Sequence, residues 1–179
     1  HFCDKEAFNA CLHPFIRNAV GCMEFGGCFL NKRLNRNNDG GTTRRTTDIF
    51  QLATTVLFQN PVQNFALAPN NLEDVSPVCM DYMKTIPTTW DETCFIDGYP
   101  GKYVVLARRH GGTWYVAAIN AGKETLKLKL DLEMFAGKTV SLYKDDKKGA
   151  PQLVPLKVKE NGKVQLEILP QGGAVLVNK

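Results

Sequence analysis

The sequence HPFIRNAVGCMEF, from His13 to Phe25, places a short apolar run between charged residues. Residues 19–23 are mostly apolar and bounded by Gly and Pro signals, which is typical of a strand covered on both faces in a parallel sheet. Glu24 closes the run, and α/β proteins bind ligands beyond the carboxyl ends of such strands, so Glu24 is a candidate pocket residue. The alternative is that Arg17 and Glu24 form a structural ion pair or are solvated loop charges.

Helical patterns flank the expected strand in the first 85 residues. Residues 4–12 carry apolar side chains near one face of a weak helix. Thr46 or Thr47 is expected to cap a second helix, which has Asp48 in its first turn and a broad apolar face. Ser76-Pro77 begins a third helix. Strand, loop and helix in this order predict a βα unit, with the Gly- and Asn-rich residues 26–43 as a lid, a pocket wall or a mobile insertion.

The hydrophobic period changes from helical to two after Pro87. Leu126, Leu128 and Leu130 alternate with polar residues most clearly. Short strands separated by turn residues such as Asp97-Gly98 predict an antiparallel β-sandwich. We place a domain boundary near residue 85, so that residues 1–85 and 86–179 form two domains. The candidate strands cover residues 89–96, 102–108, 113–119, 125–130, 139–144, 153–158, 163–168 and 173–177.

Length and composition indicate a globular chain. The 179 residues are 44% hydrophobic, and 22 Lys and Arg residues against 18 Asp and Glu residues give a net charge of +4. The basic residues are too scattered for a nucleic-acid footprint, and no apolar run reaches the roughly 20 residues that span a bilayer. The chain has no initiator Met or signal peptide and opens in a polar phrase, so we expect it to be the C-terminal piece of a longer protein.

The cysteines and histidines give no metal-binding spacing. Six cysteines stand at positions 3, 11, 22, 28, 79 and 94, without a CxxC pair. Their apolar neighbours favour buried thiols over a disulfide framework, which belongs to short secreted domains. A bridge between Cys22 and Cys28 remains an open alternative.

Two motifs could carry carbohydrate chemistry. Asp91-Glu92 offers the two carboxylates that glycoside hydrolysis needs, but adjacent strand residues point to opposite faces, so we expect a domain-interface contact instead. Trp114-Tyr115 is either a sugar-stacking platform or part of the core. The sequence contains no nucleophile elbow, phosphate-binding Gly loop or HExxH motif. Residue chemistry alone therefore predicts no complete active site.

Three phrases of the sequence resemble a known enzyme family. They are PFIRNAVGCMEF (14–25), TTDIFQLATTVLFQNPVQNFA (46–66) and IPTTWDETCFIDGYPGKYVVLARR (86–109). Together they are similar to the C-terminal part of glycoside hydrolase family 97, the bacterial α-glucosidases and α-galactosidases. The resemblance implies an α/β plus all-β fold: residues 1–85 would be the last βα portion of a catalytic (β/α) TIM barrel, and residues 86–179 a C-terminal antiparallel β-sandwich.

The resemblance also implies an exo-acting glycosidase that removes terminal α-linked sugars from oligosaccharides, in the periplasm or outside the bacterial cell. The family's catalytic carboxylates and calcium ligands lie upstream of this chain, so we expect the chain alone to be inactive, with the rest of the parent polypeptide as its partner. Arg17, Asn18 and Glu24 are the substrate-binding candidates that carry over. The family more often shows PFTRNxxGPMDYTP here, from which this sequence departs at Ile16, Cys22, Glu24 and Gly26.

Two other hypotheses fit the same sandwich. A non-catalytic module could bind glycans through exposed aromatic residues, or a scaffold domain could mediate subunit contacts. A glycan array on residues 85–179 separates the first from the glycosidase hypothesis, which expects little sugar affinity in this domain.

Overall fold

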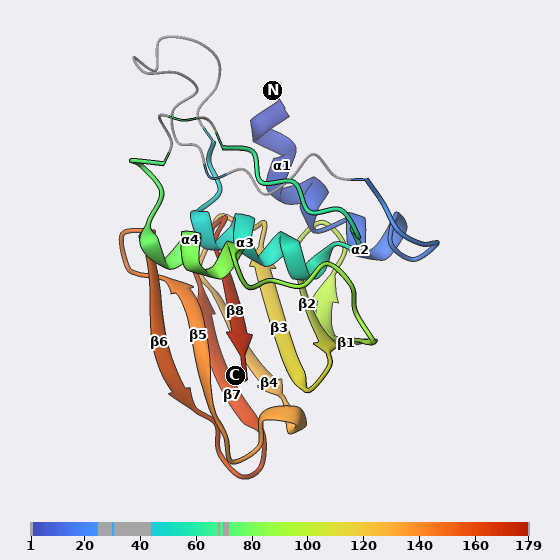
Figure 1. Ribbon diagram of the computed structural model, residues 1–179, viewed down its shortest axis with the longest axis vertical. Coiled ribbons are helices and arrows are strands. Elements are labelled where there is room, and N and C mark those ends of the chain that lie inside the picture. Colours follow the sequence, from blue (N-terminus) through green and yellow to red (C-terminus); the bar gives the residue numbers. More distant parts are fainter. Residues whose placement is uncertain (1, 25–29, 31–43, 68, 70–71, 179) are drawn as a thin grey trace.

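The computed structural model describes residues 2–24, 30, 44–67, 69 and 72–178. Helices come first along the chain and strands follow (Figure 1). The helices are α1 (Phe2–Ala10), α2 (His13–Ile16), α3 (Asp48–Leu57) and α4 (Pro77–Met83). The strands are β1 (Glu92–Tyr99), β2 (Tyr103–His110), β3 (Thr113–Asn120), β4 (Leu126–Asp131), β5 (Thr139–Asp145), β6 (Pro151–Lys157), β7 (Lys163–Ile168) and β8 (Gly173–Val177).

The strands form two antiparallel sheets, which confirms the predicted sandwich. Six strands pair in the order β1-β2-β3-β8-β5-β6, and β4 pairs with β7. The alternation of apolar and polar residues determines which face of the small sheet is buried. Leu128, Leu130 and Val164 are buried, while the lysines that alternate with the leucines face solvent. These side chains pack against Val105 and Val116 of the large sheet. The core between the sheets therefore follows directly from the period-two pattern.

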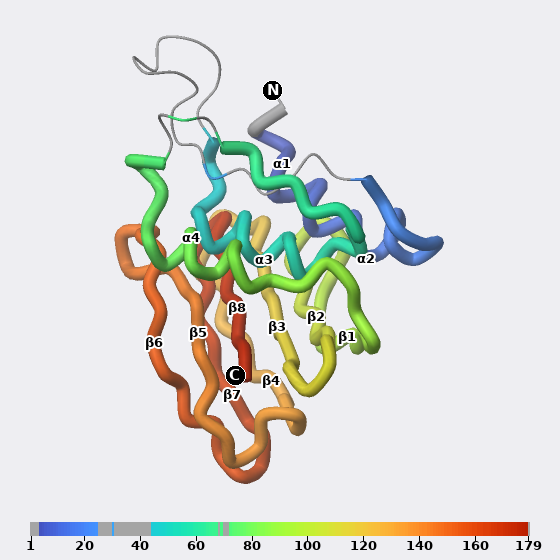
Figure 2. The backbone as a smooth tube through the Cα atoms, in the orientation of Figure 1, coloured from blue at the N-terminus to red at the C-terminus, as the bar shows by residue number. Residues whose placement is uncertain are grey.

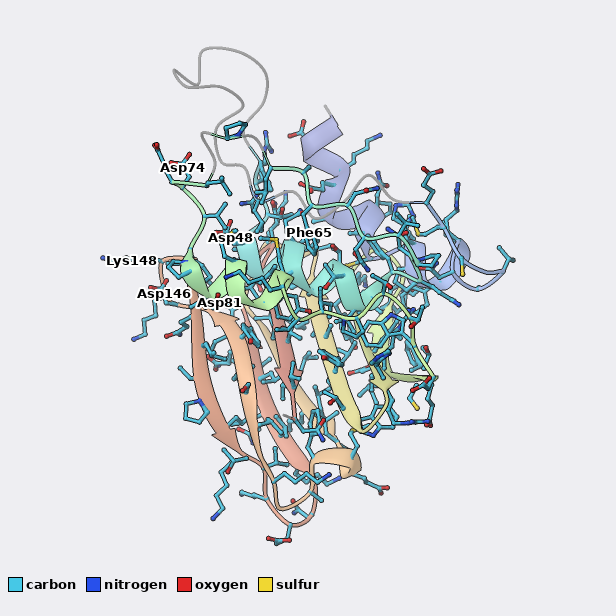
Figure 3. All side chains as sticks on the ribbon, in the orientation of Figure 1. Asp48, Phe65, Asp74, Asp81, Asp146 and Lys148 are labelled. Carbon is cyan, nitrogen blue, oxygen red and sulfur yellow. The ribbon has the colours of Figure 1, made fainter. Side chains whose placement is uncertain are left out.

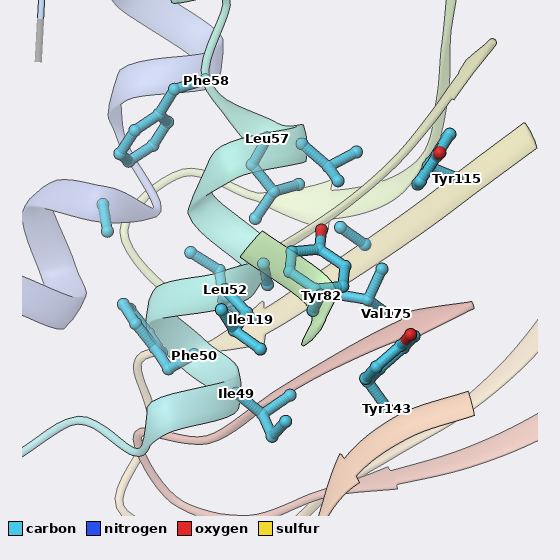
Figure 4. Packing of buried hydrophobic residues seen from close by; sticks show 14 of the residues in the cluster. Ile49, Phe50, Leu52, Leu57, Phe58, Tyr82, Tyr115, Ile119, Tyr143 and Val175 are labelled. Atoms are coloured by element: carbon cyan, nitrogen blue, oxygen red, sulfur yellow. The ribbon is translucent and has the colours of Figure 1, made fainter. Parts of the chain in front are cut away.

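Helix α3 covers the opposite face of the large sheet, so the molecule has three layers (Figures 1 and 2). All ten residues of α3 are buried. Figure 4 shows Phe50 and Leu52 of α3 close to Ile119 of β3, and Val175 of β8 belongs to the same buried cluster. The apolar residues of α3 pack in the core against the large sheet, and the polar residues Asp48, Gln51, Thr54 and Thr55 are buried with them. No helix in the described ranges is long and apolar enough to cross a membrane.

The prediction of a buried strand within residues 13–25 is wrong. His13–Ile16 forms α2, residues 17–24 form no strand, and Val20 is 91% exposed. A parallel strand needs hydrogen-bonded neighbours, and no other strand precedes Glu92 in the part of the chain that the structure describes. The predicted βα unit is therefore not formed there. Phe25 and the predicted loop at 26–43, except Leu30, lie outside the described residues.

The turn predicted at Asp97-Gly98 is also wrong. Both residues lie within β1, where the pairing with β2 shifts register between Phe95 and Asp97. The chain turns at residues 100–102 instead. A β-bulge tolerates the same small and polar residues as a turn, which explains the error.

Candidate functional site

Asn18 fastens the segment after α2 to the end of α3. Its Nδ2 donates to the carbonyl oxygens of Gly21 (3.1 Å) and Gln59 (3.4 Å), and its Oδ1 accepts from the Gln59 amide (3.0 Å). The Met23 amide donates to the same Gln59 oxygen (2.9 Å). These bonds hold residues 18–23 in place, so Asn18 has a structural role within this chain.

Arg17 and Glu24 lie apart from one another. The Arg17 amide ends α2 by donating to the His13 carbonyl (3.0 Å), and the side chains of Arg17 and Glu24 are both exposed. Among the described residues no ion pair joins them. Of the two structural alternatives, solvated charges therefore describe them. Substrate binding by Arg17, Asn18 and Glu24 stays a prediction.

A buried polar cluster fixes the first turn of α3 against the large sheet. Thr47 Oγ1 accepts from the Phe50 amide (3.1 Å), which confirms the predicted cap, and it donates to Asp145 Oδ2 (2.9 Å). The Gly173 amide donates to the same oxygen (3.1 Å). Burial raises the pKa of Asp145 to about 6, against the effect of these two hydrogen bonds. Asp145 therefore ties α3 to β5 and β8.

A second set of polar contacts joins α3 to α1. Gln51 Nε2 donates to Glu6 Oε1 (2.6 Å), and a pocket of about 100 Å³ lies beside this bond, with His13 on its wall. Burial, followed by the charge of Arg17, lowers the pKa of His13. The described lining of the pocket has one carboxylate, that of Glu6, whereas glycoside hydrolysis uses a pair. This lining therefore does not provide the catalytic pair.

Asp91 and Glu92 contact the same guanidinium group. Arg109 Nε lies 3.2 Å from Glu92 Oε2, and Arg109 Nη1 lies 3.7 Å from Asp91 Oδ2. The prediction that the two carboxylates cannot share a site is wrong, because β1 begins at Glu92 and strand alternation does not apply to Asp91. Both carboxylates are about half exposed and are paired with Arg109. The pair holds the segment before β1 to the β2–β3 turn, where the Gly111 amide donates to Asp91 Oδ2 (2.7 Å).

Trp114 and Tyr115 do not form a joint platform. Tyr115 is 7% exposed and packs edge-on against Trp90, with ring centroids 5.3 Å apart. Trp114 packs against the core between the two sheets, and Arg109 lies 5.9 Å from its ring centroid. Adjacent strand residues point to opposite faces, so the rings cannot stack on one sugar.

The thiols and acids of the described residues do not form a metal site. Cys11, Cys22 and Cys94 have free thiols; Cys11 and Cys79 are buried as predicted, whereas Cys22 is exposed. Cys28, the possible partner of Cys22, lies outside the described residues. No group of three or more His, Cys, Asp or Glu side chains in these ranges could hold a metal ion. The described side chains therefore do not assemble a calcium site.

Comparison with known proteins assigns the strands to a family. Residues 89–178 match the family model described as "Glycosyl-hydrolase 97 C-terminal, oligomerisation". A probable retaining alpha-galactosidase of Streptomyces bingchenggensis is 33% identical over 61% of this chain and 16% of its own length. A retaining alpha-galactosidase of Bacteroides thetaiotaomicron is 29% identical over 91% of this chain and 26% of its own length.

A solved structure is similar over nearly the whole chain. The crystal structure of a beta-arabinopyranosidase shares 82% sequence identity and a TM-score of 0.95 over 99% of this chain and 28% of its own. The chain thus spans between 16% and 28% of the length of these relatives. The family model covers half of the chain, from the end of the helical part to the last strand. The chain therefore belongs to glycoside hydrolase family 97, and residues 89–178 are its C-terminal domain.

Proposed function

We propose that this chain is the C-terminal part of an exo-acting glycosidase that removes terminal β-arabinopyranosyl and α-galactosyl groups from oligosaccharides. The observation that carries the proposal is the 82% identity to a beta-arabinopyranosidase over 99% of the chain. An L-arabinopyranose ring has the hydroxyl configuration of galactose and lacks only the exocyclic hydroxymethyl group. The alpha-galactosidases among the relatives are consistent with a single pocket that recognises the hydroxyl configuration shared by the two sugars.

The catalytic residues of this enzyme would lie in the part of the longer protein outside this chain. Within the described residues, the adjacent carboxylates Asp91 and Glu92 are paired with Arg109, and Glu6 is bonded to Gln51. The missing portion would supply the barrel strands and the calcium ligands expected from the family resemblance. We place the enzyme in the periplasm or outside the cell, which fractionation of the source cells would test.

The substrate proposal is tested with the full-length enzyme and three p-nitrophenyl glycosides. We expect kcat/KM to fall in the order β-L-arabinopyranoside, α-D-galactopyranoside, α-D-glucopyranoside. The loss on adding the hydroxymethyl group is expected to be about 10- to 200-fold, the usual range for one small group in a fitted pocket. A preference for the glucoside would contradict the proposal, because its C4 hydroxyl has the opposite configuration.

We further propose that the sandwich mediates self-association, as the description of the family model suggests. The glycan-binding alternative is less well supported, because Tyr115 is buried and Trp114 packs against the core and beneath Arg109. Exposed apolar side chains instead lie along the β1 edge, namely Phe95 and Tyr99. Sedimentation equilibrium of the 179-residue chain tests this role.

A further inference from the structure

Arg108 of β2 is a buried cation with an incomplete set of partners. Only 2% of the residue is exposed. Its Nη2 donates to the carbonyl oxygen of Leu57 at the end of α3 (3.3 Å). Its Nε and Nη1 are buried and have no hydrogen-bond partner in the structure described here. Two N–H-bearing atoms of a charged group are therefore unsatisfied, which is costly in a protein interior.

Trp90 adds a third unsatisfied donor at the same place. Its Nε1 is buried without a partner among the described residues, and the guanidinium carbon of Arg108 lies 6.0 Å from its ring centroid. Both side chains line a pocket of about 200 Å³. Other neutral side chains complete the wall, namely Cys22, Gln59, Pro61, Thr88, Thr89 and Thr93.

The pocket has an uncompensated positive charge. Burial lowers the pKa of Arg108 to about 10, and the described acidic group that acts on it is the Cys22 thiol, which is negative only when deprotonated. Arg44, which is also buried, is different because it forms an ion pair with the buried carboxylate of Asp48. Burying a charge without such a partner destabilises a protein. Among the described residues, Arg108 therefore has no carboxylate partner of the kind that Arg44 has.

We propose that the pocket lined by Arg108 and Trp90 binds a carboxylate group. Its unsatisfied groups are all donors, so the ligand must accept hydrogen bonds, and the charge of Arg108 favours an anion. A carboxylate oxygen accepts a strong, charge-assisted hydrogen bond from a guanidinium N–H, so it can satisfy Nε or Nη1 of Arg108. The volume admits this group with some water, since a water molecule occupies about 30 Å³ in the liquid. The carboxylate belongs either to an acidic side chain of the longer protein or to a free ligand.

The test uses sodium acetate as the probe and the two tryptophans of the chain as reporters. Trp114 is a matched internal control, because Arg109 lies over its ring much as Arg108 lies over Trp90, but Arg109 is already paired with Asp91 and Glu92. In the 179-residue chain we expect acetate to shift the indole N–H NMR signal of Trp90 saturably and to leave that of Trp114 unchanged. Sodium chloride at equal ionic strength should shift neither signal.

Variants assign the effect to one guanidinium. Arg108→Gln should weaken the acetate response at least tenfold, whereas Arg109→Gln should preserve it. A Trp90 signal that does not move, or that moves with chloride or in parallel with Trp114, would overturn the proposal, and this comparison needs only the wild-type chain. Repeating the titration on the full-length protein identifies the source of the carboxylate. An unresponsive Trp90 there indicates an acidic side chain already bound, and a responsive Trp90 indicates a free carboxylate ligand.

Discussion

Asp145 is a buried carboxylate whose ionisation opposes folding. Burial raises its pKa to about 6, hydrogen bonds from Gly173 and Thr47 act against this, and the charges of Asp48 and Asp146 add repulsion. Because the unfolded value is about 3.9, the stabilising contribution is complete below pH ~4 and is lost as the pH rises through 6. We predict that the unfolding free energy of the wild type falls by roughly 2–3 kcal/mol relative to Asp145→Asn between pH 4 and pH 8, measured by urea denaturation.

Asp146, the next residue, provides a control with the opposite sign. It is half-buried at the β5–β6 turn (Figure 3), and amide donors from Ala150 and Lys148 lower its pKa. A lowered folded pKa contributes stability above the unfolded pKa, which is lost as the pH falls through the folded value. The loss of unfolding free energy caused by Asp146→Asn should therefore be smallest at acid pH. Parallel stability curves for the wild type and Asp145→Asn would contradict the account of Asp145.

Individual side-chain partners were the least predictable feature of this chain. The capping role of Thr47 follows from local sequence, since a Thr before an apolar helix satisfies its first amides. Its bond to Asp145 joins residues 98 positions apart, which no local pattern encodes. One feature of the sequence could have indicated that Arg108 is buried. Arg108 follows four buried residues of β2, Val104–Ala107, and a strand covered on both faces buries its charged residues as well.

Close packing of α3 on the large sheet depends on a glycine in β8. A Cβ atom at Gly173 would lie 2.8 Å from Phe50 Cα and 2.9 Å from the Ile49 carbonyl oxygen, both of them backbone atoms. Backbone cannot yield as a flexible side chain does, so Gly173→Ala should destabilise the chain by about 1–3 kcal/mol. Thermal denaturation is the measurement.

The matched control is Gly112, in the β2–β3 turn. An added Cβ there meets no atom within 4 Å, so Gly112→Ala should stay within about 0.5 kcal/mol of the wild type. Equal effects of the two substitutions would show that α3 is not held as closely to β8 as the structure indicates.

Elements whose partners lie within the chain were predicted well. The β4 and β7 strands match the alternating residues 125–130 and 163–168 to within one residue, because each pairs with the other and buries every second side chain. The α3 and α4 helices begin at their predicted caps. The strand predicted within residues 13–25 failed for the corresponding reason: its composition suits a buried strand, but the described residues of this chain provide no neighbouring strand.

The two edge strands of the large sheet differ in how readily they can contact another chain. Strand β6 carries Pro151 and Pro155, which remove amide donors and discourage pairing with another chain. Strand β1 instead exposes Phe95 and Tyr99, at 59% and 58%. The ring of Phe95 also contacts the helical layer. It packs edge-on against Phe15, with the two ring centroids 5.9 Å apart. An apolar surface of this kind marks an interaction site.

We predict that a second copy of the chain covers the β1 edge. Phe95→Ser should shift the 179-residue chain toward the monomer in sedimentation equilibrium, with at least a tenfold weaker association constant. Leu153→Ser, which removes an exposed apolar residue from the β6 edge, is the control and should leave association unchanged. An unaltered molecular mass for Phe95→Ser, or a larger effect of Leu153→Ser, would place the contact elsewhere.

At the scale of the whole molecule, the central claim is that this chain supports a glycosidase without containing its catalytic carboxylates. The direct test compares kcat/KM for p-nitrophenyl β-L-arabinopyranoside between the full-length protein and the purified 179-residue chain at equal molar concentration. The account predicts steady turnover by the full-length enzyme and a rate equal to the buffer blank for the chain. Turnover by the chain that disappears in Asp91→Asn/Glu92→Gln would contradict it, because catalysis would then reside in the sandwich itself.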